Sequence, residues 1–143
     1  MKYFRILKDY IVRLGKIGLS PHEIALGVAV GIFVAFIPLF GTHTITAIVL
    51  ASLLRVNTLI VLLGTQISNP LTLPVQLLIS AEVGSVVLHG EFLKITSSYE
   101  LSYLLSHYLL PIIVGGLILG IVGSGISYVL VKGFFHRKQN DTA

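Results

Sequence analysis

The chain has 143 residues, of which 55% are hydrophobic and 11% are charged, and it carries a formal net charge of +4 and no cysteine. A soluble domain has roughly 25% charged residues, so this composition excludes an ordinary soluble protein and predicts an integral membrane protein. The absence of cysteine excludes a disulfide, a thiolate metal site and a cysteine nucleophile. No cleavable signal peptide is expected, because no small-residue cleavage site follows the first apolar segment.

The positive charges lie at the two ends of the chain and leave the middle almost uncharged. Only five Asp, Glu, Lys or Arg residues fall between Ile24 and Val131. The cations outside that region are Lys2, Arg5, Lys8, Arg13, Lys16, Lys132, Arg137 and Lys138. By the positive-inside rule both termini face the cytoplasm, and the number of membrane crossings is even. The basic charge is therefore interpreted as a topology signal, and no nucleic acid partner is expected.

Residues 1–19 are predicted to form a basic amphipathic helix that lies at the membrane interface. Ser20 is the expected N-cap of the next helix, with Glu23 as the acid of a capping box. This helix has an apolar run from Ile24 to Ile37 and then meets Pro38. At about 1.5 Å per residue the run covers about 21 Å, which is less than the roughly 30 Å of a hydrocarbon core.

Further apolar segments follow this first break. Residues 44–63 are long enough to span a membrane but contain Arg55, and residues 71–88, after a second break, contain Glu82. Residues 97–108 are predicted to form an interfacial helix, and residues 111–131 form the clearest transmembrane segment. The chain is therefore divided into an interfacial helix (1–19), a core with broken helices (20–90), an external interfacial segment (91–110), a transmembrane helix (111–132) and a basic cytoplasmic tail (133–143).

The predicted fold is an all-α integral membrane protein with about four membrane segments. The two proline-centred breaks, residues 37–43 and 68–74, are either kinks or re-entrant hairpins. Small residues recur at a spacing of four, which allows helices to pack closely in lipid. This pattern predicts helix contacts within the chain or across an oligomer, through Gly27, Gly31, Gly116 and Gly120. A homo-oligomer is expected, because one copy offers few helices to enclose a pathway.

Arg55 is the first candidate for a binding residue, because a guanidinium inside an apolar segment needs a partner or a water-filled cavity. Its planar fork suits a phosphate or carboxylate ligand. Two alternatives are open: Arg55 snorkels to the interface from a helix end, or it forms a structural ion pair with Glu82. Glu82 is in turn a candidate for a proton-coupling carboxylate or a counter-ion.

Both breaks supply backbone donors, since each one starts a new helix whose positive dipole end attracts anions. Together with the guanidinium they predict one site for an anionic headgroup. Its candidate ligands are Arg55, His43, Thr42, Asn57, Asn69 and Thr72. The alternative is that Thr42 and Asn69 only cap their own helices. No nucleotide-binding loop, serine nucleophile motif, close carboxylate pair or metal-ligand spacing is visible, so no enzyme activity, cofactor or metal is expected.

A series of short motifs in the core carries a family resemblance. These motifs are Ser20-Pro21, Gly27, Gly31, Pro38-x-x-Gly41, Arg55-x-Asn57, Asn69-Pro70-x-Thr72 and Gly84. Over about residues 20–90 the chain resembles the bacterial membrane family DUF2062, whose function is unknown. Relatives in that family occur alone or joined to glycosyltransferase-like domains that work on lipid-linked sugars. The resemblance implies the bacterial inner membrane and a lipid-phosphate or glycolipid ligand. The broken-helix plan is also similar to that of bacterial polyprenyl-phosphate translocases.

The leading hypothesis is a multi-pass membrane protein that binds the anionic headgroup of a lipid, such as an isoprenoid phosphate, and translocates or presents it. Two other hypotheses stay open. One is a structural subunit that anchors a glycosyltransferase or another envelope enzyme. The other is a small ion or solute transporter that uses Glu82 as its coupling group.

Overall fold

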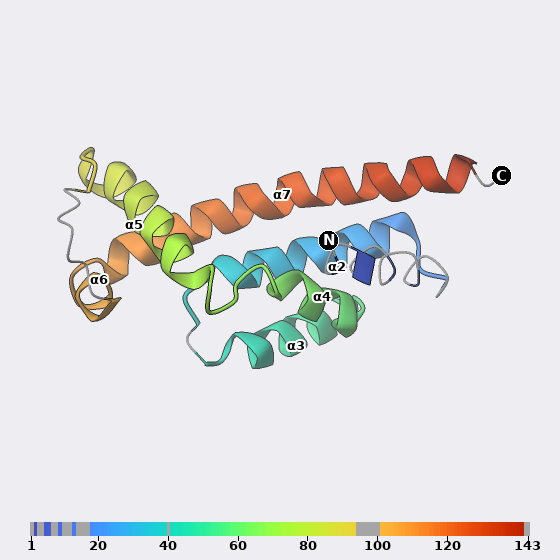
Figure 1. Cartoon of the computed structure of the whole chain (residues 1–143), viewed down its shortest axis with the longest axis horizontal. Coiled ribbons are helices and arrows are strands. Elements are labelled where there is room, and N and C mark those ends of the chain that lie inside the picture. The colour runs from blue at the N-terminus through green and yellow to red at the C-terminus, as the bar shows by residue number, and fades with distance from the viewer. Residues whose placement is uncertain are drawn as a thin grey trace.

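The structure, a computed structural model, describes residues 18–39, 41–93 and 101–141, together with Lys2, Arg5, Ile6, Asp9 and Arg13. Within these residues every regular element is a helix, which confirms the predicted all-α class (Figure 1). Apart from those isolated positions, the predicted interfacial helix over 1–19 lies outside the described residues. The helices are α2 (Pro21–Phe36), α3 (His43–Leu53), α4 (Thr58–Thr65), α5 (Leu73–His89), α6 (Leu101–His107) and α7 (Leu109–Asp141).

α2 begins at the capping box that the sequence predicts. The backbone N–H of Glu23 donates to Ser20 Oγ at 3.2 Å, and the backbone N–H of Ser20 donates to the Glu23 carboxylate at 2.7 Å. This backbone hydrogen bond is the main reason why the pKa of Glu23 lies below its ordinary value. The helix ends where Ile37 becomes extended, with φ −79° and ψ 129°, because the residue before Pro38 is kept out of the helical region.

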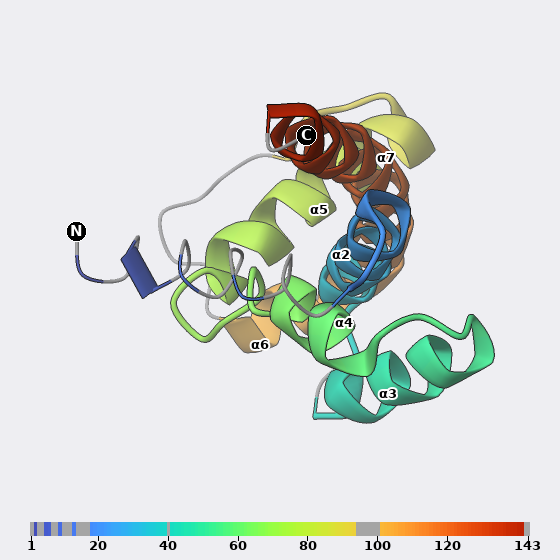
Figure 2. The ribbon, with the colours of Figure 1, turned by 90° about the vertical axis from the view of Figure 1, so that its right-hand side faces the viewer.

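α7 runs antiparallel to α2 and lies beside it (Figures 1 and 2). A Cβ atom on Gly116 would lie 2.5 Å from the carbonyl oxygen of Phe36, at the end of α2. One turn further along α7, a Cβ atom on Gly120 would lie 3.2 Å from the ring of Phe33. These two glycines allow the backbones of α2 and α7 to approach more closely than any larger residue permits.

The other glycine pair of the predicted stripe lies against α4. A Cβ atom on Gly27 would lie 2.8 Å from Cγ2 of Ile60, and one on Gly31 would overlap the carbonyl oxygen of Val61. A Cβ atom on Gly64 of α4 would in turn lie 3.0 Å from Cα of Gly31. All of these contacts are made inside one chain, and a role for the glycines in a homo-oligomer stays a prediction.

α5 crosses α7 obliquely near the start of α7 (Figures 1 and 2). A Cβ atom on Gly84 would overlap the carbonyl of Pro111, and one on Gly115 would overlap the carbonyl of Ser80. This is the tightest helix contact in the described part of the chain. The sequence stripes did not include this contact, although Ser80 and Gly84 also stand four residues apart.

Among the described helices, α7 alone is long and apolar enough to cross a membrane by itself. It has 33 residues, and its most apolar stretch has a mean hydropathy of 2.3 with 28% of that stretch buried inside the chain. Large hydrophobic side chains are exposed along it, among them Ile121, Val129 and Leu130. The core helix of a soluble domain would be mostly buried, so an exposed apolar helix of this length fits a membrane protein.

Candidate functional site

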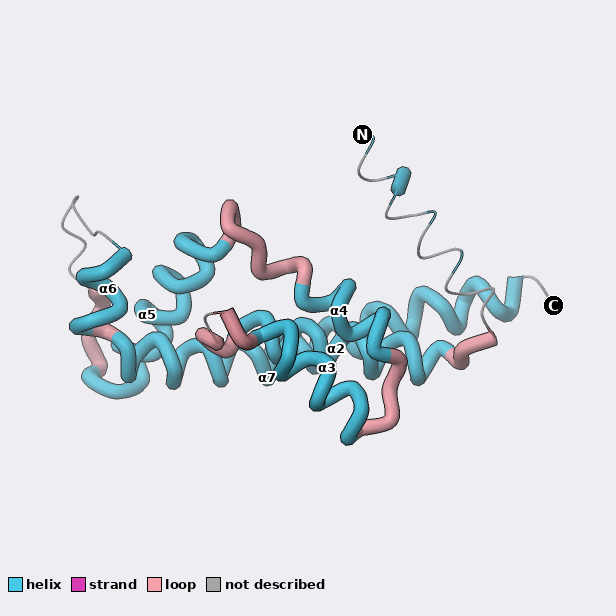
Figure 3. The backbone as a smooth tube through the Cα atoms, turned by 90° about the horizontal axis from the view of Figure 1, so that it is seen from below, coloured by secondary structure: helices cyan, strands magenta, loops and turns pink. Residues whose placement is uncertain are grey.

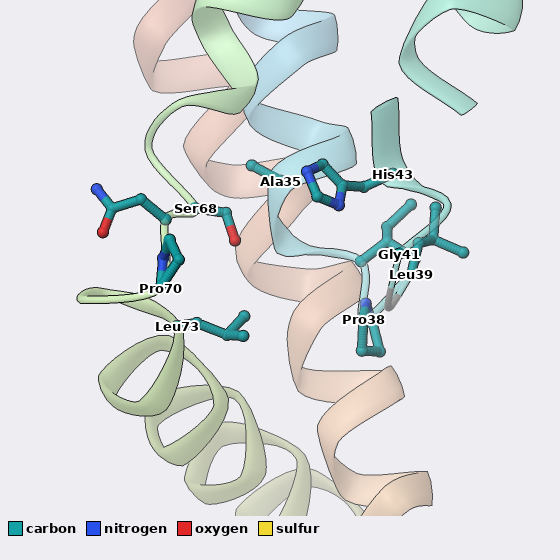
Figure 4. A pocket seen from close by; sticks show the side chains of 10 residues that line it. Ala35, Pro38, Leu39, Gly41, His43, Ser68, Pro70 and Leu73 are labelled. Carbon is teal, nitrogen blue, oxygen red and sulfur yellow. The ribbon is translucent and has the colours of Figure 1, made fainter. Parts of the chain in front are cut away.

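The two breaks lie beside each other in space and enclose one pocket of about 180 Å³ (Figure 4). In Figure 4 the imidazole of His43 extends from the start of α3 toward the second break. The lining is mainly apolar, with His43, Ser68 and Asn69 as its polar members. The apolar and glycine residues of the lining are Ala35, Ile37, Pro38, Leu39, Gly41, Pro70 and Leu73.

The first break is a short turn between α2 and α3. Pro38 has no N–H group, and the chain turns so that the N–H groups of Thr42 and His43 both donate to the carbonyl of Leu39, at 3.2 and 3.1 Å. Gly41 adopts φ +75°, a conformation that favours glycine. The side chain of Thr42 makes no cap hydrogen bond to α3.

The second break is held by a network of side-chain hydrogen bonds around Asn69. Its Oδ1 atom accepts from the backbone N–H groups of Leu71 and Thr72, at 2.9 and 3.0 Å. The hydroxyl of Thr72 accepts from the N–H of Asn69 at 3.0 Å and donates to the carbonyl of Ile67 at 2.7 Å. Asn69 and Thr72 therefore use these atoms to stabilise the turn. This is the structural role that the alternative prediction gives to Asn69.

Two helix N-termini border the pocket. α3 begins at His43 and α5 at Leu73, and both residues belong to the lining. The side-chain amide of Gln76 donates to the carbonyl of Ala35 at 2.5 Å, which ties the first turn of α5 to the last turn of α2. Because helix dipoles are positive at their N-termini, α3 and α5 together give the pocket a positive potential.

His43, like Ser68, is a polar residue of the pocket whose side chain forms no hydrogen bond with the described residues. It is half-buried, and nothing among the described residues forms a hydrogen bond or an ion pair with its imidazole. A neutral imidazole has one N–H donor and one acceptor, and a protonated imidazole has two donors. Either form can donate a hydrogen bond to an oxygen in the pocket.

Arg55 occupies the turn between α3 and α4, where the predicted segment 44–63 divides into two helices. Its φ is +54°, and it is the one described non-glycine residue with a positive φ. The N–H of Arg55 donates to the carbonyl of Ser52 at 3.3 Å, and that of Val56 donates to Ala51 at 3.0 Å. These two bonds form a Schellman motif, in which the position of Arg55 usually belongs to glycine.

The structure divides the predicted ligand set into two groups at opposite ends of α3. His43, Thr42, Asn69 and Thr72 lie at the break end, and Arg55 lies at the other. α3 has 11 residues, so at about 1.5 Å per residue its ends are about 16 Å apart. A single continuous helix over 44–63 would separate the two groups by about the same distance, so the prediction of one site did not take into account the length of the segment between His43 and Arg55.

Asn57 also lies at the Arg55 end, where it is the N-cap of α4. Its Oδ1 atom accepts from the N–H groups of Leu59 and Ile60, at 3.0 and 3.3 Å. Arg55 itself is exposed, and no ion pair joins it to another described residue. The turn is therefore closed by backbone hydrogen bonds and by the hydrogen bonds of the Asn57 side chain. The guanidinium of Arg55 does not contribute to them.

Comparison with known protein families places the chain in a bacterial family. The model of an uncharacterized protein family conserved in bacteria, DUF2062, matches residues 4–143. The chain belongs to this family. No curated protein and no solved structure matches the chain. The DUF2062 match extends well beyond the residues 20–90 of the predicted resemblance, so α7 and the basic ends are part of the family's common region.

Glu82 lies on α5, well away from Arg55. One of its carboxylate oxygens accepts the backbone N–H of Leu93 at 3.2 Å, which fastens the chain after α5. Arg55 and Glu82 are both described residues, and no ion pair joins them. The coupling role predicted for Glu82 stays a prediction, and the observed contact is structural.

A polar cluster that the sequence analysis did not identify joins the first turn of α2 to α7. The hydroxyl of Tyr128 lies 2.7 Å from Nδ1 of His22 and accepts a hydrogen bond from Nζ of Lys132 at 3.3 Å. No sequence pattern links residues so far apart. Within the described residues, no group of three or more His, Asp or Glu side chains is placed to hold a metal ion.

Proposed function

We propose that the chain is an integral membrane protein that binds the anionic headgroup of a lipid, such as an isoprenoid phosphate, in the pocket between its two breaks. The observation that carries the proposal is the convergence of both breaks on one pocket, in a chain whose helices expose apolar side chains. In a bilayer, broken helices need polar partners, and paired breaks are where several membrane transporters build their binding sites.

The size of the pocket favours a headgroup over a whole lipid. Its volume of about 180 Å³ is a little larger than the roughly 150 Å³ cavity that holds a benzene molecule in another protein. A phosphate group fits this volume, and an isoprenoid chain does not. The chain of the lipid would lie outside, along exposed apolar residues beside the second break such as Leu71 and Val75, which are 86% and 59% exposed.

The electrostatics of the pocket favour an anion. The positive dipole ends of α3 and α5 act on the same space, and they act strongly because a mainly apolar lining lowers the local dielectric constant. His43 would donate a hydrogen bond to the headgroup, and the hydroxyl of Ser68 is placed to add a second one. Asn69 and Thr72 would contribute by fixing the second turn, and Thr42 by starting α3.

The proposed topology has α7 as the single uninterrupted crossing. α2 would enter from the side where α7 ends and stop level with Gly116, which lies beside Pro38, and α5 would continue to the opposite side. α3 and α4 measure about 16 and 12 Å, so they would form a re-entrant hairpin instead of two further crossings. Both termini would then share the cytoplasmic side of the bacterial inner membrane, in agreement with the positive ends.

The proposal is tested by native mass spectrometry of the purified protein, with identification of the lipids that remain bound. The wild type is compared with His43→Ala and with the control His89→Ala, whose histidine is exposed at the end of α5. A hydrogen bond to a charged group contributes about 1.5 to 3 kcal/mol, so His43→Ala should lower the occupancy of an anionic lipid about ten-fold or more. His89→Ala should retain it.

Two other results have a clear meaning. Identical bulk lipids on all three proteins would contradict the headgroup site. If a glycosyltransferase then co-purifies with the wild type and with His43→Ala alike, the scaffold hypothesis replaces it. Translocation or presentation of the lipid becomes testable only after the His43 result, by following headgroup accessibility in vesicles that contain the protein.

A further inference from the structure

We infer that the Arg55 turn is a second, separate lipid contact: its guanidinium binds the phosphate of an anionic phospholipid at the membrane surface on the basic side of the protein. This inference rests on the membrane orientation given under the proposed function, and it does not depend on what occupies the pocket. It concerns the end of α3 that lies farthest from His43.

The position of the turn is fixed by the first residues of α4. Ile60 packs with Ile24 in a buried cluster, and the partly buried Val131 and Phe135 of α7 pack against it. The α3–α4 turn therefore lies beside the first half of α2, toward the end of the molecule where α2 begins (Figures 1 and 3). Lys132 and Arg137 follow on the same stretch of α7. The guanidinium is thus at the basic end, which the positive-inside rule assigns to the cytoplasmic surface.

The neighbours of Arg55 are those of a lipid-facing residue. Leu53 is 73% exposed and Leu54 is 52% exposed, so an apolar pair stands directly before the cation at the tip of the hairpin. Such a tip can bury its leucines among acyl chains while the guanidinium reaches the phosphate level. Free phosphate would leave both leucines in water, so the apolar pair points to a lipid as the source of the phosphate.

The charge of Arg55 is unused by the fold. No ion pair joins it to another described residue, and the Schellman bonds of the turn involve only backbone atoms of Arg55 and its neighbours. A left-handed conformation is costly for a residue with a side chain, and glycine would form this turn at lower cost. The presence of arginine at such a position is explained by what its side chain binds.

The experiment uses the fact that the chain has no tryptophan. Leu54→Trp places a single indole beside Arg55. Its fluorescence is measured in mixed vesicles of phosphatidylglycerol and phosphatidylcholine, in which either the phosphatidylglycerol or the phosphatidylcholine is brominated. Bromine quenches only from close contact, so the ratio of quenching gives the local preference for the anionic lipid. One cation near an anionic surface contributes about 1 kcal/mol, which corresponds to about a five-fold preference.

The matched variants carry Leu54→Trp together with Arg55→Gln, Arg55→Lys or Arg55→Gly. The Gln and Gly substitutions should reduce the preference to about one, and the Lys substitution should keep most of it. Arg55→Gly also relieves the left-handed backbone, so a loss of preference in that variant is not a loss of fold. As a control, Phe92→Trp lies 75% exposed at the opposite end, and it should report the same lipid preference with and without the Arg55→Gln substitution.

Several outcomes would overturn the inference. Equal quenching by both lipids beside Arg55, or a preference that survives Arg55→Gln, removes the phosphate contact. Absence of quenching by either lipid takes the turn out of the membrane and contradicts the orientation as well. The pocket is scored separately, because the lipid that depends on His43 should remain bound in Arg55→Gln. A negative result at the Arg55 turn therefore does not affect the interpretation of the result at the pocket, and the reverse also holds.

Discussion

The two ends of α3 are built in opposite ways. At the His43 end two proline-centred breaks from different parts of the chain meet, and in the second break the side chains of Asn69 and Thr72 form hydrogen bonds with the backbone of their own turn. At the Arg55 end a single turn closes on its own backbone and leaves the charged side chain exposed. A charge in the middle of an apolar run is therefore no sign of a buried site, because a turn can carry it to the surface.

The difference extends to the contacts that hold each end in place. The break end is fixed by backbone packing, since Gly116 brings α7 against Phe36 and beside Pro38. At the turn end the first contact is made by a side chain, with Ile60 against Gly27 and in the cluster of Ile24, and the backbone contact of Gly31 with Val61 lies about one turn farther along α2, toward the break. A backbone contact cannot adjust, whereas a side chain can change rotamer. The break end should therefore tolerate substitution less well than the turn end.

The largest expected effect is that of Gly116→Leu. A Cβ atom there would lie 2.5 Å from the carbonyl oxygen of Phe36, so the side chain forces α2 away from α7 at the pocket. We expect a loss of about 3 kcal/mol in the free energy of unfolding, at the upper end of the usual cost of overpacking. The measurement is an unfolding titration in mixed detergent micelles, in which the loss of helicity is recorded.

Two controls make this result specific to the break end. Gly125→Leu adds the same side chain to α7 where nothing lies within 4 Å, and it should leave stability within about 0.5 kcal/mol of the wild type. The Cβ atom of Gly27→Ala meets the side chain of Ile60 at 2.8 Å, with the nearest backbone atom, the carbonyl oxygen of Asn57, at 3.8 Å, so this substitution should cost less than Gly116→Leu. If Gly27→Ala is as damaging as Gly116→Leu, the contrast between backbone and side-chain packing fails.

The parts of the fold that could be predicted follow from local rules. Proline at position 38 and the Asn69-Pro70 pair indicate the breaks, and the Ser20 and Glu23 pair indicates the start of α2. Each of these signals acts on residues close in sequence, through the proline ring or through a cap. The all-helical class follows from the same kind of evidence.

The parts that could not be predicted depend on turns hidden in apolar sequence and on distant contacts. Residues 44–63 divide at Arg55 because of a Schellman motif, which hydropathy does not detect, although Asn57 as an N-cap was an available signal. The helix of 111–132 extends to Asp141 through the predicted tail, because helix continuity does not require apolar residues. The meeting of the two breaks is a tertiary contact, and no spacing within one sequence indicates it.

The second prediction compares the two asparagines that cap the turns. Asn69 and Asn57 each accept two backbone N–H groups. Asn57→Ala should cost about 1 kcal/mol, the usual cost of an N-cap. Asn69→Ala should cost about 2 kcal/mol, because Thr72 loses a partner in the same network. Unfolding in mixed micelles measures both values.

A second readout separates the two ends functionally. Asn69→Ala should also reduce lipid occupancy in native mass spectrometry, since it loosens a wall of the pocket, and Asn57→Ala should leave occupancy unchanged. The result that would reverse the comparison is a loss of bound lipid in Asn57→Ala alone. The site would then have to be moved from the break end of α3 to its other end.

The smallest expected effect has the opposite sign and concerns Arg55→Gly. The left-handed conformation costs a residue with a side chain about 1 to 2 kcal/mol, and glycine avoids this cost. Glycine also has more conformational freedom in the unfolded chain, which lowers the stability of the folded state by about 0.5 to 1 kcal/mol. The variant should therefore be more stable than the wild type by about 0.5 kcal/mol, with Arg55→Ala showing no such gain because it keeps the left-handed backbone. A loss of stability in Arg55→Gly would mean that the arginine side chain holds the turn. A gain would mean that the chain keeps a less stable turn at this end of α3, which is the pattern of a residue retained for what it binds.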